Sequence, residues 1–81
     1  MLQIVDVEYI EGHTLEIHFD NGDTGIVDFA KLLNGKIYKP LKKVELFKQY
    51  GLKNGTLEWV NGADFAPEYL HKHLRTKLAK A

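Results

Sequence analysis

The chain has 81 residues, which is the length of one small domain. It contains no cysteine and no serine, which excludes disulfide bonds and every catalytic triad that depends on either residue. Eleven basic and eleven acidic residues give a net charge of zero, which is not typical of an independent nucleic-acid-binding domain.

The charges are nevertheless segregated along the chain. Residues 1–30 carry seven acidic residues and no lysine or arginine, whereas residues 31–54 carry seven lysines against Glu45 alone. One interpretation is an acidic sheet and a basic half that mainly keep the protein soluble. The other is a basic face for an acidic partner.

The first residues lack the basic and long apolar segments of a signal peptide, and no apolar run approaches the roughly 20 residues that span a bilayer. We therefore expect a soluble cytoplasmic protein with no membrane partner.

Two strands are predicted at the start. Residues 3–10 alternate, with Val5, Val7 and Tyr9 on one face. Residues 14–19 alternate more cleanly, and their inward positions are Leu15, Ile17 and Phe19.

A hairpin is predicted next, because Asn21-Gly22 is typical of a two-residue type I′ turn. This turn would place Phe19 opposite Thr24 and begin a third strand over residues 24–29.

The middle of the chain is predicted to be largely helical. Asp28 is a candidate cap for a short helical segment over 29–33. Residues 36–41 are expected to be extended, since the residue before Pro40 avoids the α conformation. A helix is predicted over 42–50, ending at Gly51.

A fourth strand is predicted over 56–60, with Leu57 and either Trp59 or Val60 inward. Asp64 is a candidate helix cap, and Pro67 begins a long C-terminal helix that reaches about Lys80. The predicted fold is α+β, a three- or four-stranded, mostly antiparallel sheet packed against two or three helices in a single domain over 1–81. The predicted core comprises Val5, Val7, Leu15, Ile17, Phe19, Phe47, Trp59, Leu70 and Leu74.

Several motifs together resemble the bacterial family known as domain of unknown function 2442, over about residues 3–70. The most specific motif is Trp-x-Asn-Gly-Ala-Asp at 59–64, followed by Pro67 and the pair Tyr69-Leu70. The others are Ile-His-Phe-Asp-Asn-Gly at 17–22, Val27-Asp28, Pro40-Leu41 and Leu46-Phe47.

The resemblance implies a small cytoplasmic α+β protein with an antiparallel sheet. Some family members are encoded beside another small protein, and a toxin–antitoxin-like pairing has been suggested for them. The resemblance supplies no set of catalytic residues, and it leaves the role of the basic segment beyond Leu70 open.

Asp64 beside Trp59 could bind a cation or act as a base. The alternative, which the sequence favours, is a structural junction in which Asn61-Gly62 turns the chain, Asp64 caps a helix and Trp59 anchors the core. The four histidines are not spaced as a metal site, since His71 and His73 lie two residues apart on the predicted helix. We therefore expect no catalytic residue, no metal and no cofactor. The candidate partner-binding residues are Trp59, Asn61, Asp64, Lys72 and Arg75.

The first functional hypothesis is a non-enzymatic protein-interaction module, the partner of a separately encoded protein. The second is an accessory nucleic-acid-binding domain that uses the lysine-rich middle and the C-terminal helix. A metal-dependent enzyme using Asp64 and a histidine is the third. A homodimer through an exposed sheet edge stays open.

Overall fold

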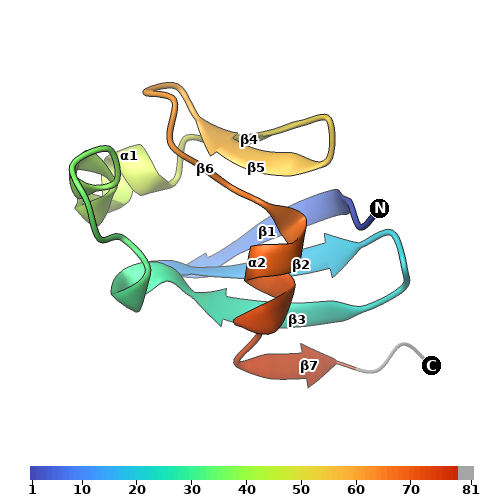
Figure 1. The fold of residues 1–81 in the computed structure, drawn as a ribbon. Coiled ribbons are helices and arrows are strands. Elements are labelled where there is room, and N and C mark those ends of the chain that lie inside the picture. Colours follow the sequence, from blue (N-terminus) through green and yellow to red (C-terminus); the bar gives the residue numbers. More distant parts are fainter. Residues whose placement is uncertain (79–81) are drawn as a thin grey trace.

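The computed structural model describes residues 1–78, with side chains as far as Arg75. It is an α+β structure with two antiparallel sheets (Figure 1). The larger sheet has the strand order β1-β2-β3-β7 and the smaller the order β4-β5-β6. Their bounds are β1 Ile4–Glu11, β2 Thr14–Phe19, β3 Thr24–Asp28, β7 Thr76–Leu78, β4 Tyr50–Lys53, β5 Thr56–Trp59 and β6 Asp64–Phe65.

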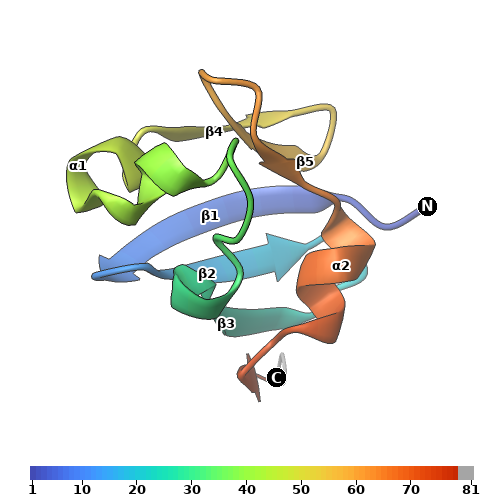
Figure 2. The same ribbon diagram turned by 60° about the vertical axis from the view of Figure 1, so that its left-hand side comes forward.

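The helical segments are all short. Two are 3-10 turns, η1 and η2, and two are α-helices, α1 and α2 (Figures 1 and 2). Their bounds are η1 Phe29–Lys31, η2 Lys39–Lys42, α1 Val44–Phe47 and α2 Pro67–Lys72. Asp28 caps η1 as predicted, since its carboxylate accepts a hydrogen bond of 3.0 Å from the amide of Ala30.

The first strand is correctly predicted, and Val7 and Tyr9 pack against the core as expected, but the predicted inward face is wrong at the start of the strand. Val5 is 58% exposed and Ile4 is buried, the reverse of the prediction. The pairing explains why, because Ile4 lies opposite Phe19 whereas Asp6 lies opposite His18, so Val5 is the extra residue of a β-bulge. A bulge resets the alternation, and Val7 again faces inward opposite Ile17.

The predicted register of the β2–β3 hairpin is wrong by one residue. Asn21-Gly22 does not form a two-residue turn; the amide of Gly22 donates to the carbonyl of Phe19, and the amide of Phe19 donates to Asp23. Only Gly22 has a positive φ, +91°, as in a three-residue loop that ends in a glycine bulge. His18 therefore lies opposite Thr24, and Val27 joins Leu15 on the buried face.

The predicted helix over 42–50 is too long, and the segment over 36–41 is not extended but forms turns that lead into η2. α1 covers only Val44–Phe47, and β4 begins after Lys48 and Gln49 and pairs with β5 across Asn54-Gly55. Both turn residues have positive φ, +53° and +77°, which is the requirement for a type I′ turn. This hairpin places Tyr50, the last residue of the predicted helix, in the smaller sheet together with residues 51–53.

The long C-terminal helix is the largest error. α2 stops at Lys72, and the chain then pairs with the edge of β3: the amide of Arg75 donates to the carbonyl of Ile26 at 2.7 Å, and Thr76 lies opposite Ile26. The strand β7 thereby covers a sheet edge that would otherwise be open. The last predicted helical residues, 79–80, lie outside the described part of the chain.

The core joins the two sheets through aromatic rings. The ring centroid of Phe29 lies 5.4 Å from that of Phe47, 5.3 Å from that of Phe65 and 6.3 Å from that of Trp59. Of the predicted core residues, six are buried, Leu15, Ile17, Phe19, Phe47, Trp59 and Leu70, whereas Val7 and Leu74 are partly buried. Phe29, Leu33 and Phe65 are buried residues that the prediction left out.

Candidate partner-binding surface

Trp59 lies in the core rather than on the surface, with only 4% of its area exposed. It comes from β5, where it alternates with the half-buried Glu58. Its indole N–H donates to the backbone carbonyl of Phe47 at 2.8 Å, and the two rings lie 5.8 Å apart. A buried indole N–H needs such a partner, so this bond fixes the end of α1 against β5.

Asn61 shapes the turn between β5 and β6. Its side-chain oxygen accepts from the amide of Ala63 at 3.1 Å, and its side-chain N–H donates to the carbonyl of Ile37 at 2.8 Å. The turn repeats the geometry of the loop between β2 and β3, since Gly62 has a φ of +92°. The amide of Trp59 donates to the carbonyl of Ala63, and the carbonyl of Trp59 accepts from the amide of Gly62. The side chain of Asn61 therefore holds this turn against Ile37, which lies just before η2.

A groove opens between this turn and the segment that contains η2 and α1. Its volume is about 280 Å³, and its lining is mostly apolar. Val60, at the tip of the turn, is 95% exposed, and Leu46 on α1 is 40% exposed. The lining residues are Pro40, Leu41, Leu46, Gln49, Trp59, Val60 and Asn61.

Asp64 is not a helix cap. It lies in β6 and its residue is exposed, whereas the N-cap of α2 is Ala66, which makes no side-chain hydrogen bond. The prediction failed because β6 and one further residue separate the turn from Pro67. The backbone carbonyl of Asp64 accepts a 2.8 Å hydrogen bond from the hydroxyl of Tyr38, beside a second, more polar hollow that also includes Tyr69.

Two tyrosines have raised pKa values. Burial raises the pKa of Tyr38 above its ordinary value of 10.0, and the charges of Asp64 and Tyr69 add to the shift. Burial likewise raises the pKa of Tyr50, with the carboxylates of Asp6 and Glu8 as further causes.

These shifts predict a loss of stability in alkali. The native state keeps its protons on Tyr38 and Tyr50 at a pH where the unfolded chain releases them, so their contribution to stability is complete below pH 10 and falls as pH rises through the native pKa values. Tyrosinate absorbance should therefore show a late-titrating component from Tyr38 and Tyr50. This component should be smaller in the Tyr38→Phe variant, and a component of unchanged size would contradict the expectation.

Lys72 and Arg75 lie away from the groove. Lys72 is the last residue of α2, and Arg75 follows in the connection to β7. The guanidinium of Arg75 lies 3.8 Å from the carboxylate of Asp28, beyond the end of a typical hydrogen bond, and both groups are partly exposed. Of the five predicted site residues, only Trp59 and Asn61 line the groove.

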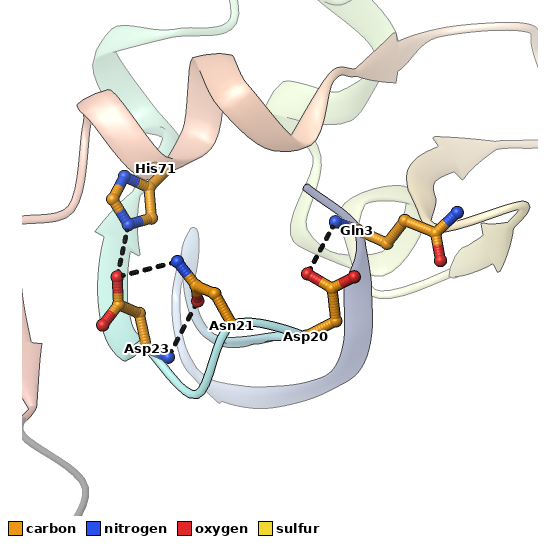
Figure 3. Close-up of polar contacts among 5 residues, drawn as sticks. All are labelled: Gln3, Asp20, Asn21, Asp23 and His71. Carbon is orange, nitrogen blue, oxygen red and sulfur yellow. Dashed lines mark hydrogen bonds and ion pairs between the residues drawn. The ribbon is translucent and has the colours of Figure 1, made fainter. Parts of the chain in front are cut away.

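A polar cluster at the first hairpin loop was not predicted (Figure 3). His71 on α2 contacts the carboxylate of Asp23 through Nε2 at 2.7 Å, and its ring lies 5.1 Å from Phe19. Asn21 contacts the same carboxylate at 3.1 Å and also accepts from the Asp23 amide. The cluster fixes α2 over the hairpin loop, which is a sufficient structural role for a histidine–carboxylate pair.

The same loop is tied to the start of the chain. The carboxylate of Asp20 accepts a 3.1 Å hydrogen bond from the backbone amide of Gln3 (Figure 3). The only sequence signal for either contact is the polar run Asp-Asn-Gly-Asp at 20–23, which indicates a turn but not its partners.

The sequence also raised a metal site that would use Asp64 and a histidine. Within residues 1–78, no three His, Cys, Asp or Glu side chains lie close enough together to hold a metal ion. His71 and His73 do point to different partners, since Nδ1 of His73 lies 2.9 Å from the carbonyl of Tyr69. In the same part of the chain, no helix is long and apolar enough to cross a membrane.

The family model described as protein of unknown function (DUF2442) matches residues 4–76. The chain belongs to this family. The resemblance seen in the sequence is thereby confirmed, and the match extends beyond it through α2 to the start of β7. No curated protein and no solved structure matched the chain.

Proposed function

We propose that this family member is a non-enzymatic protein-interaction module that acts in the cytoplasm and binds its partner through the groove beside Val60. The partner would be a separately encoded protein, in a toxin–antitoxin-like pair.

One observation carries the proposal, the exposed apolar wall of the groove. Val60 is almost fully exposed, so packing does not explain an aliphatic side chain at the tip of a turn, and Leu46 lines the same groove. Exposed apolar residues that are gathered around a hollow mark binding surfaces more often than scattered ones do. Ile37, which is also partly exposed, would lie 3.7 Å from a Cβ at Gly62, so the apolar surface continues past the turn.

Co-purification from the native cells tests this. The tagged parent protein should recover a stoichiometric partner, and the Val60→Ser variant should lose it because the apolar contact is removed. Val5→Ser is the matched control, since Val5 is also exposed but lies on β1, away from the groove. A partner that is retained equally by both variants would contradict the proposal.

An accessory nucleic-acid-binding domain is the second candidate. The observation in its favour is the exposure of all seven lysines between residues 31 and 53. Phosphate contacts would make binding weaken steeply with salt. Fluorescence anisotropy with duplex and single-stranded oligonucleotides separates the candidates, because Lys42→Glu/Lys43→Glu should abolish such binding whereas Val60→Ser should leave it intact.

A further inference from the structure

We infer that the groove receives an acidic segment of the partner protein that inserts a large apolar side chain between Leu46 and Val60. This inference rests on the proposed function and specifies the chemistry of the partner. Three features of the groove support it: its size, the state of its polar groups and the charge of its surroundings.

The size of the groove favours a protein side chain over a cofactor. Its volume of about 280 Å³ lies just below the roughly 300–1,000 Å³ of clefts that enclose small-molecule ligands. One or two apolar side chains of a docked segment fit such a volume. The buried ring of Trp59 would then form part of the contact surface while it keeps its own place in the core.

The polar groups of the groove are few, and one is already engaged. The side-chain amide of Asn61 uses its oxygen on Ala63 and one N–H on Ile37. Gln49 is the other polar side chain in the lining. The interior therefore offers an apolar surface with little to orient a charged group, so recognition of charge must come from the rim.

The rim is basic. Residues 36–49, which supply four of the lining residues, carry five lysines and one acidic residue, Glu45, a net charge of plus four. Two lysines directly flank lining positions in sequence, Lys39 before Pro40 and Lys42 after Leu41, whereas the ammonium of Lys48 lies over the ring of Tyr9, 4.9 Å from its centroid. All five lysines are exposed. A complementary occupant combines an apolar anchor with surrounding carboxylates, because complementary charge speeds association and selects among apolar competitors.

A defined peptide tests the occupant. The probe is a short amphipathic peptide with leucines at i and i+4 and glutamate at most other positions, and it contains no tryptophan. Trp59 is the only tryptophan of the protein and lines the groove, so its fluorescence reports occupancy directly. We expect saturable binding that weakens with added salt. Two control peptides, one with lysine for glutamate and one with serine for leucine, should bind at least about tenfold more weakly.

Protein variants locate the site. Val60→Ser and the double variant Lys42→Glu/Lys43→Glu should each weaken the acidic peptide by about tenfold. The matched controls Val5→Ser and Lys53→Glu should bind like the parent, since both residues are exposed and lie on β1 and β4. Equal binding of the acidic and basic peptides, or binding that is insensitive to Val60→Ser, would overturn the inference.

Other occupants give different results. Self-association that rises with protein concentration and is lost in Val60→Ser would assign the groove to a second copy of this chain, and oligonucleotide binding that is lost only in the lysine variant would assign the rim to nucleic acid. Either result overturns the inference. If the acidic peptide fails while Val60→Ser still abolishes co-purification of the partner, the occupant chemistry is wrong and the interaction module stands. If co-purification is also unaffected, the proposed function falls with it.

Discussion

Replacement of Phe29 by alanine is expected to lower the free energy of unfolding by about 3–5 kcal/mol. Phe29 is fully buried, and its ring lies between Phe47, Trp59 and Phe65, which come from three different elements. It also follows β3 directly, so it connects the larger sheet to the aromatic cluster of the smaller one. A cavity there would loosen both sheets at once.

That loss is large for a domain of this size. At about 0.05–0.15 kcal/mol per residue, 81 residues have a total stability of roughly 4–12 kcal/mol. Urea denaturation followed by circular dichroism measures the change. Val60→Ala is the control and should shift the midpoint little, because Val60 is almost fully exposed. A loss below about 1 kcal/mol in Phe29→Ala would contradict the assigned role of the ring.

Gly55→Ala is expected to be strongly destabilising. Gly55 has a φ of +77°, so any side chain there meets the strain of the left-handed region. In addition, a Cβ would lie 2.7 Å from Cβ of Gln3, too close for either atom to remain in place. The carbonyl of Gly55 also accepts a 2.9 Å hydrogen bond from the amide of Ile4, which links the two sheets.

Gly22→Ala provides the matched control. Its φ of +91° imposes a similar backbone strain, but no other atom lies within 4 Å of the added Cβ. We therefore expect Gly55→Ala to be less stable than Gly22→Ala by about 1–3 kcal/mol, the usual cost of overpacking. Equal melting behaviour of the two variants would show that the approach of Gln3 to the turn has no energetic consequence.

Turn geometry was only partly predictable from the residues. The dipeptide Asn-Gly forms a type I′ turn at 54–55 but closes three-residue loops at 21–22 and 61–62. In both three-residue loops the asparagine oxygen accepts from the amide two residues later, which holds the asparagine itself at a negative φ. The dipeptide indicates a turn in each case, but a hairpin was predicted only at 21–22, and the flanking strand pairing decides which loop forms.

The candidate groove was predictable only in its parts. The sequence indicated that Trp59 is a core anchor and that one of Trp59 and Val60 faces inward, and the structure assigns these roles to Trp59 inside and Val60 outside. It gave no sign that Asn61 would bond the carbonyl of Ile37, 24 residues earlier. That long-range contact brings the basic segment to the turn and creates the groove.

The elements that depend on contacts between neighbouring residues could be predicted from the sequence. Alternating apolar and polar residues predicted β2, and an apolar segment predicted β5. Asp28 predicted the cap of η1 and Pro67 the start of α2, because both depend on contacts within a few residues. The end of α2, in contrast, depends on contacts with a distant strand. Local propensity favours a helix beyond Lys72, but the open edge of β3 offers backbone hydrogen bonds to Arg75 and its successors, and the chain takes them as β7.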